Sequence, residues 1–235
     1  MNVFRMLYCR TFQTVFRMAL PLLPYRTPEI LTGTDRLPEL FREKGIDRVL
    51  LVTDSSIRGL GITRHTEEVL AGAGIRCSVY DGTVANPTTD NVEEALALYR
   101  ADGCEAIIGF GGGSSMDCAK AVGARAANPG RSLAKMEGIL KVRRRLPLLV
   151  AVPTTAGTGS ETTLAAVITD SQTRHKYPIN DFPLIPRYAV LDPEVTRGLP
   201  RHITATTGLD ALTHAVEAYI GRPTTKGTRR DAEEA

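Results

Sequence analysis

The sequence predicts an α/β fold built on a parallel sheet, followed by the beginning of an all-helical domain. Over the first two thirds of the chain, short apolar runs of strand length alternate with stretches of helical spacing. This alternation is typical of parallel sheets that are covered by helices on both faces. Beyond about residue 195 the alternation stops, and the segment from Thr204 is predicted to be one long helix.

The individual elements follow one another in regular order. The apolar, β-branched run RVLLVTD predicts a buried strand, and a helix after it ends at Gly74, which suits a C-cap. A second helix opens with Thr and Asp residues that can cap it. The expected strands are 48–54, 75–82, 105–110 and 147–154, the expected helices are 63–74, 88–103 and 114–127, and the later segments AAVITD and YAVLDP are expected to be short strands.

Length and composition indicate an ordinary globular protein. The chain has 235 residues, of which 43% are apolar and 23% are charged, and its net charge of +3 is too small to indicate nucleic-acid binding. No apolar run approaches the length of a membrane span. The four cysteines lack CxxC spacing, which indicates a reduced chain and predicts a cytoplasmic location. Cys104 and Cys118 are expected in the core.

The N-terminal segment 1–26 has two interpretations. Four arginines and no acidic residue precede Glu29, a composition that resembles a transit peptide. However, the arginines interrupt the apolar stretch, and no small-residue cleavage site follows it. The pattern therefore favours an amphipathic helix that packs on the body of the protein or on a partner subunit.

A glycine-rich turn predicts a phosphate site. In GFGGGSSMDCAKAVG, residues 109–123, three glycines stand between a predicted strand and a predicted helix. Glycine lets the backbone approach a ligand closely, the helix N-terminus presents free N–H groups, and Ser114 can cap the helix and donate. The spacing only approximates the dinucleotide fingerprint of a Rossmann-like domain, so a tight turn without a ligand is the alternative.

Two further features make a nucleotide ligand more plausible. PTTAGTGSE, residues 153–161, also follows a strand and can surround a polar ligand group with backbone and hydroxyl donors. Asp54 closes the first strand, where a carboxylate can accept from ribose hydroxyls and repel a 2′-phosphate. An N-cap for the next turn is the equally weighted alternative for Asp54.

The segment DALTH predicts part of a metal site. It places Asp210 and His214 four residues apart on one face of a helix, where both could bind one divalent cation. Because three or four ligands are needed, a surface Asp–His pair or a cap is the alternative.

Taken together, these motifs resemble the iron-containing (group III) alcohol dehydrogenase family. The resemblance rests on LLVTD, NPTTDNV, IIGFGGGSSMDCAKAVG, LPLLVAVPTTAGTGSETTLAAVITD, LDPEVTRGLP and TTGLDALTHAVEAYIG, which occur in family order from about residue 27 to the end. It implies an α/β nucleotide domain over 1–195, a helical metal domain beginning at 196–235, and metal-assisted hydride transfer between an alcohol or aldehyde and NAD(P).

The resemblance also assigns roles to single residues. It places Asp54 at the adenine ribose, Asn86 near the adenosine side, and Lys176 near the nicotinamide ribose. Asp210 and His214 would be the first two ligands of Fe²⁺ or Zn²⁺. The pyrophosphate and its loop would be held by Gly112, Gly113, Ser114 and Asp117, with Thr154, Thr155 and Thr158 along the cofactor. The sequence shows no general base, so we assign no catalytic residue.

Some features depart from the family or leave choices open. The charge of Asp54 favours NAD over NADP, while the basic run KVRRRLP, residues 141–147, could meet a 2′-phosphate but is better explained as a solvated loop. Family members are longer and carry two further histidine ligands on later helices, so we expect a truncated form of doubtful activity with Leu212, Val216 and Tyr219 uncovered. The substrate and the metal are not predicted, and a homodimer is expected only from the resemblance.

Two alternative functions follow from the same residues. The chain could be a non-catalytic nucleotide-binding remnant. It could also be a relative on the same scaffold, similar to a glycerol dehydrogenase or a dehydroquinate synthase, although PTTAGTGSE and DALTHAVEAY argue against this.

Overall fold

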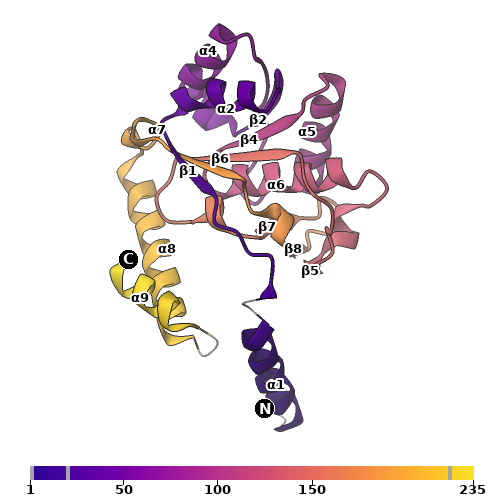
Figure 1. Cartoon of the computed structure of the whole chain (residues 1–235), viewed down its shortest axis with the longest axis vertical. Helices are drawn as coiled ribbons and strands as arrows, with labels where there is room; N and C mark the ends of the chain where they lie inside the picture. The colour runs from indigo at the N-terminus through magenta and orange to yellow at the C-terminus, as the bar shows by residue number, and fades with distance from the viewer. Residues whose placement is uncertain (1–2, 20–21, 222–223) are drawn as a thin grey trace.

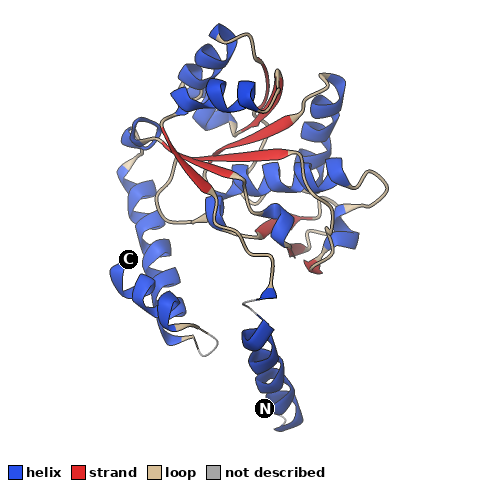
Figure 2. Cartoon of the chain, in the orientation of Figure 1, coloured by secondary structure: helices blue, strands red, loops and turns tan. Residues whose placement is uncertain are grey.

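A six-stranded parallel sheet forms the centre of the molecule (Figures 1 and 2), as the alternation of strands and helices predicts. The fold is that of a computed structural model, which describes residues 3–19, 22–221 and 224–235. The strand order is β1-β9-β6-β4-β2-β3, and each neighbouring pair is parallel. The strands are β1 (Glu29–Thr32), β2 (Arg48–Val52), β3 (Arg76–Tyr80), β4 (Ala106–Gly111), β6 (Leu148–Pro153) and β9 (Tyr188–Leu191).

Helices cover both faces of this sheet. The alternation of side chains along β2 sends Val49 and Leu51 into one core and Leu50 and Val52 into the other. All four side chains are fully buried, which explains why the strand reads as a continuous apolar run. The helices of this part are α2 (Leu37–Glu43), α3 (Ser55–Gly59), α4 (Arg64–Gly72), α5 (Thr89–Ala101) and α6 (Gly113–Ala127), with short 3₁₀ turns at Thr34–Arg36, Leu133–Met136, Ser160–Thr162 and Phe182–Leu184.

A second, three-stranded sheet packs beside α6 and was only partly predicted. It consists of β5 (Gly138–Ile139), β8 (Lys176–Asn180) and β7 (Ala165–Thr169), with β7 and β8 antiparallel. The sequence predicts β7 but not β8, because Pro178 interrupts the short run KYPIN. The structure accommodates the proline at an exposed position between Tyr177 and Ile179, which are both buried.

The chain continues after β9 as three helices. These are α7 (Pro193–Arg197), α8 (Arg201–Ile220) and α9 (Lys226–Glu234). The long helix predicted from Thr204 is confirmed and begins slightly earlier, directly after Pro200. As expected, its apolar side chains are uncovered, with Leu212 59% exposed and Val216 and Tyr219 each 49% exposed. A domain boundary near residue 195 stays a prediction.

The N-terminal segment forms the predicted helix, but this helix does not cover the body of the protein. Helix α1 (Val3–Ala19) stands away from the sheet in Figure 1. The side chains of Leu7, Tyr8 and Met18 are 61%, 71% and 74% exposed. Packing on the body is therefore wrong for this structure, and packing on a partner subunit stays a prediction.

The cysteines lie where the sequence predicts them. Cys104 and Cys118 are buried, as predicted, and all four cysteines are free. Burial raises the pKa of the Cys118 thiol to about 12, so it is an unreactive core side chain. Within the described residues, no helix has the length and hydropathy needed to cross a membrane.

Candidate functional site

The carboxyl ends of β2, β4 and β6 open into one crevice of about 580 Å³. In parallel sheets these strand ends meet at the same edge, where ligands of open α/β folds bind. One wall comes from the turn after β2, another from the start of α6, and a third from the segment that leads into α8. We call it the carboxyl-edge crevice, and it is lined by Asp54–Ile57, Leu60, Ile62, Thr83–Ala85, Gly112–Ser115, Thr154, Thr155, Val195, Gly198–Pro200 and Ile203.

The start of α6 presents unblocked backbone donors to this crevice. Its N-cap is Gly112, no side chain caps it, and no acidic residue lies in its first turn. The free N–H groups and the positive end of the helix dipole therefore favour an anion there. At Gly111 the φ angle is +143°, and a Cβ would lie 2.6 Å from Ser115 Oγ, so only glycine fits.

Ser114 lies elsewhere than the sequence suggested. The expectation that it caps α6 is wrong, because the helix already begins at Gly113 and Gly112 is the N-cap. Ser114 lies in the first turn and lines the crevice. Its Oγ accepts a hydrogen bond of 3.4 Å from the backbone N–H of Asn86.

The loop after β6 lies directly against this helix start. A Cβ placed at Gly112 or Gly113 would be 3.6 Å from Thr155 Cγ2 or 3.5 Å from Thr158 Cγ2, respectively. Thr154 and Thr155 line the crevice, whereas Thr158 is not among its lining residues. The hydroxyl of Thr155 is buried without a hydrogen-bond partner. A buried polar group without a partner is costly, so a hydrogen-bonding group of a ligand beside this hydroxyl would be favourable.

A buried network fixes this loop to α6. The side chain of Lys120 is 1% exposed, and its Nζ donates to the carbonyls of Ser160 and Ala165 and to the hydroxyls of Ser160 and Thr163, at 2.7–3.0 Å. Burial lowers the pKa of Lys120 to about 8, against the attraction of Asp117, whose carboxylate lies 4.0 Å away.

Asp117 acts behind the crevice rather than in its wall. Its carboxylate accepts hydrogen bonds of 3.0 Å from the Ser160 hydroxyl and from the N–H of Val167. Burial raises the pKa of Asp117, and Lys120 and these two donors oppose that shift. The structure thus places Asp117 as a tie between α6 and β7, while a contact with a phosphate stays a prediction.

Asp54 is an N-cap and also part of the crevice wall. Its Oδ1 accepts from the N–H groups of Ser56 and Ile57 at 3.0 Å, which caps α3 as the alternative interpretation predicted. The same residue lines the crevice. The two interpretations are therefore compatible, and a contact with ribose stays a prediction.

Asn86 and Lys176, far apart in the sequence, come together at the side of the crevice. The ammonium group of Lys176, at the start of β8, donates to Asn86 Oδ1 at 2.5 Å. Asn86 follows the crevice residue Ala85 and has a positive φ of 58°, which asparagine tolerates better than most residues. Ser114, Asn86 and Lys176 thus form one polar chain beside the start of α6.

The two predicted metal ligands share one face of α8. The distance from His214 Nε2 to Asp210 Oδ1 is 3.8 Å, and the two side chains are 55% and 46% exposed. The carboxylate oxygen of Asp210 and the imidazole nitrogen of His214 are both ligand atoms that suit Fe²⁺ and Zn²⁺. In the described part of the chain, no group of three or more His, Cys, Asp or Glu side chains is close enough to hold a metal.

The sequence did not single out two residues that shape the site. Lys120 is a lone lysine in the apolar stretch DCAKAVG, a signal that could have indicated a buried cation. Gly157 lies against α8, and a Cβ there would be 2.1 Å from the carbonyl oxygen of Thr207. No local pattern announces that contact, because Thr207 is 50 residues away in the sequence.

Comparisons with known proteins agree with this architecture. The model of the family described as "Iron-containing alcohol dehydrogenase" matches residues 28–193. The NAD-dependent methanol dehydrogenase of Bacillus methanolicus is 37% identical over 80% of this chain and 49% of its own length. The 1,3-propanediol dehydrogenase of Klebsiella pneumoniae is 42% identical over 76% of this chain and 46% of its own length.

Solved structures have the same fold. A crystal structure of 1,3-propanediol oxidoreductase superposes with a TM-score of 0.84 at 38% identity, covering 88% of this chain and 55% of that one. The chain spans about half the length of the curated relatives it matches. The match of the family model, the identity to these relatives and the shared fold lead to one conclusion: the chain belongs to the iron-containing alcohol dehydrogenase family.

Proposed function

We propose that this chain provides the nucleotide-binding half of a metal-dependent alcohol dehydrogenase or aldehyde reductase that uses NAD. The observation that carries the proposal is the carboxyl-edge crevice, where the uncapped start of α6 faces the unpartnered hydroxyl of Thr155. This arrangement suits a pyrophosphate, because backbone dipoles and hydroxyl donors can bind it without a counter-charge. Its relatives include proteins named as NAD-dependent methanol dehydrogenase and as sulfoacetaldehyde reductase in complex with NAD⁺.

The residues of the crevice would have distinct roles. Gly112, Gly113 and Ser114 would bind the pyrophosphate, and Thr154, Thr155 and Thr158 would lie along the dinucleotide. Lys176 would orient the ribose next to the nicotinamide. We place Asn86 on this side too, rather than near the adenosine as the resemblance implies, because its hydrogen bond to Lys176 holds the two side chains together beside Ser114. Asp54 would accept from the adenine ribose and repel a 2′-phosphate, which selects NAD over NADP.

The metal would be held partly by this chain. Asp210 and His214 would supply two ligands from one face of α8, and the bound Fe²⁺ or Zn²⁺ would supply Lewis-acid stabilisation of the reacting oxygen. The chain's own contribution is to hold the nicotinamide cofactor in place and to keep two donors on a helix that adjoins the crevice through Pro200 and Ile203.

NADH binding to the purified chain tests the proposal. We expect saturable NADH binding that weakens at least about tenfold in Gly113→Val, because a side chain there would occupy the pyrophosphate position. Gly130→Val is the control, since nothing lies within 4 Å of a Cβ at that exposed position. Equal binding by both variants would contradict the placement of the cofactor.

Turnover is tested separately, with a panel of short aldehydes and added Fe²⁺ or Zn²⁺ under anaerobic conditions. Oxidation of NADH that disappears in Asp210→Ala would support the assigned metal pair. NADH binding without turnover would instead favour a nucleotide-binding protein that needs further residues for catalysis.

A further inference from the structure

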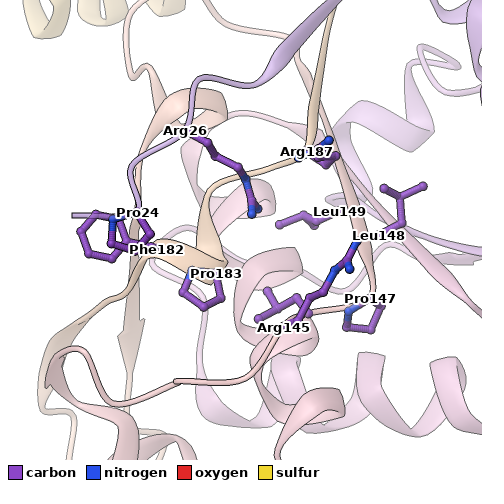
Figure 3. A pocket seen from close by; sticks show the side chains of 10 residues that line it. Pro24, Arg26, Arg145, Pro147, Leu148, Leu149, Phe182, Pro183 and Arg187 are labelled. Atoms are coloured by element: carbon purple, nitrogen blue, oxygen red, sulfur yellow. The ribbon is translucent and has the colours of Figure 1, made fainter. Parts of the chain in front are cut away.

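The opposite edge of the sheet carries a second cavity of about 300 Å³ that the proposed function does not use. It lies at the amino ends of β6 and β9, where Leu148 and Tyr188 begin their strands. We call it the amino-edge cavity; it is lined by Pro24, Arg26, Arg145–Leu149, Phe182, Pro183 and Arg187 (Figure 3). The length of β6 separates it from the carboxyl-edge crevice, because that strand ends at Pro153, directly before Thr154.

Three arginines from distant parts of the chain line this cavity. Figure 3 shows Arg26 reaching in from the segment before β1 and Arg145 from the loop before β6, on either side of Leu149. Arg187 adds a third guanidinium from the residue that precedes β9. Each guanidinium is permanently charged and presents N–H donors in a planar fork.

The backbone holds two of these arginines in place. A guanidinium nitrogen of Arg26 donates to the carbonyl of Ile185. The backbone of Arg187 donates to the carbonyl of Leu149 at 2.8 Å and accepts from the N–H of Glu29 at 3.0 Å, which fixes it between β6 and β1. The convergence of the arginines is therefore part of the fold.

Among the described residues, no acidic side chain lines the amino-edge cavity to balance its positive charge. The ion pairs between described residues do not involve Arg26, Arg145 or Arg187. The Nε of Arg26 is buried without a hydrogen-bond partner. Burial and the repulsion of Arg187 and Arg145 lower the pKa of Arg26. Like charges that line one cavity and repel one another cost free energy unless an anion joins them.

We propose that the amino-edge cavity is a binding site for phosphate or a small phosphate ester. A phosphate dianion offers several acceptor oxygens to three guanidinium forks and neutralises most of their charge, whereas a monocarboxylate offers one negative charge. The apolar walls, which include Leu149 and Phe182, leave room for the carbon part of a small ester. The site also accounts for Arg145 of the basic run 141–147, which lies on the edge opposite the carboxyl-edge crevice.

Calorimetric titration of inorganic phosphate into the whole chain at constant ionic strength, both without NADH and with NADH saturating, tests this site. We expect saturable binding whose dissociation constant rises at least about tenfold in Arg145→Gln and in Arg26→Gln. Arg145→Lys keeps the charge but loses the fork, so we expect an intermediate weakening. Arg144→Gln is the matched control, because it removes the same charge from a neighbouring exposed residue outside the cavity, and it should change binding less than about twofold.

Several outcomes would overturn the proposal. One is that phosphate does not bind the unmodified chain saturably. Another is that Arg144→Gln weakens phosphate binding as much as Arg145→Gln does. A third is that phosphate binding disappears when NADH is added, which would place the phosphate in the carboxyl-edge crevice. Tighter binding of succinate than of phosphate would show a dicarboxylate site instead. Thermal unfolding of each variant shows whether it folds. If Arg26→Gln does not fold, Arg145→Gln alone tests the site. NADH binding is measured independently, so failure here leaves the proposed function untouched.

Discussion

The two edges of the sheet differ in how they could hold an anion. The carboxyl-edge crevice uses neutral groups, namely the free N–H groups of α6 and threonine hydroxyls, held in place by a buried network around Lys120. The amino-edge cavity uses three permanent charges on long side chains. Oriented dipoles lose little hydration and keep their geometry, whereas clustered guanidiniums repel one another until an anion arrives. The first edge is preorganised by packing, and the second is stabilised by its ligand.

The largest effect is expected from removing the cation beneath the carboxyl-edge crevice. Lys120→Met removes the donor that four buried oxygens share and leaves the buried carboxylate of Asp117 without its cation. We expect a loss of about 3–5 kcal/mol in the free energy of unfolding. Denaturant unfolding measures it, and the double variant Asp117→Asn/Lys120→Met should lose less than the sum of the two single variants. An additive result would show that the two residues are not coupled.

The lowered pKa of Lys120 predicts that the free energy of unfolding depends on pH. Its pKa in the folded chain is lowered to about 8 from 10.5, so between these values the unfolded chain binds more protons. The stability that Lys120 contributes therefore rises with pH in this window, by up to about 1.4 kcal/mol per pH unit. The difference in unfolding free energy between the unmodified chain and Lys120→Met should grow from pH 8 to pH 10. A constant difference would mean that Lys120 keeps its ordinary pKa.

A smaller effect is expected where the loop after β6, here called the crevice loop, contacts α8. In Gly157→Ala the new methyl group would meet the carbonyl oxygen of Thr207, which lies 2.1 Å from an ideal Cβ. We expect a loss of about 1–3 kcal/mol and weaker NADH binding, because the loop with Thr155 and Thr158 must shift. Gly208→Ala is the control on α8 itself, since its Cβ meets nothing within 4 Å and should leave NADH binding unchanged.

Thr155→Val should change stability and cofactor binding in opposite directions. Without a ligand, the valine removes a buried hydroxyl that has no partner, so we expect the free energy of unfolding to rise by about 1 kcal/mol. NADH affinity should fall at the same time, because the proposed site uses this hydroxyl to bind the cofactor. Thermal unfolding and NADH titration measure the two effects. A variant that is less stable without NADH would show that the hydroxyl already has a partner in solution.

The smallest difference is expected in the response to salt. Raising NaCl from 0.05 to 0.5 M should weaken phosphate binding at the amino-edge cavity more than NADH binding at the carboxyl-edge crevice, because exposed charges are screened more strongly than buried dipoles. Arg145 and Arg187 are exposed, whereas Thr154 is buried. If NaCl weakens the binding of both ligands equally, the two edges do not differ in how they hold an anion.

The sequence predicts the carboxyl-edge crevice far better than the amino-edge cavity, for a physical reason. Strand β4, Gly112 and the start of α6 are contiguous, so their pattern contains the strand, the turn and the uncapped helix together. The three arginines converge only because β1, β6 and β9 are neighbours in the sheet, and pairing between distant strands leaves no local signal. Pro178 hides strand β8 from the sequence pattern, and the pattern places the cap of α6 at Ser114 although the helix begins one residue earlier.

The contact between Gly157 and Thr207 constrains how the protein can move. The two backbones meet where the crevice loop passes α8, and Asp210 follows Thr207 by less than one turn of the helix. A rotation of α8 relative to the sheet would therefore pivot near this point, with Asp210 close to the pivot and His214 one turn farther out. Opening and closing around the proposed cofactor would then move the distal part of α8 most, while Asp210, the first proposed metal ligand, stays at a nearly constant distance from the loop after β6.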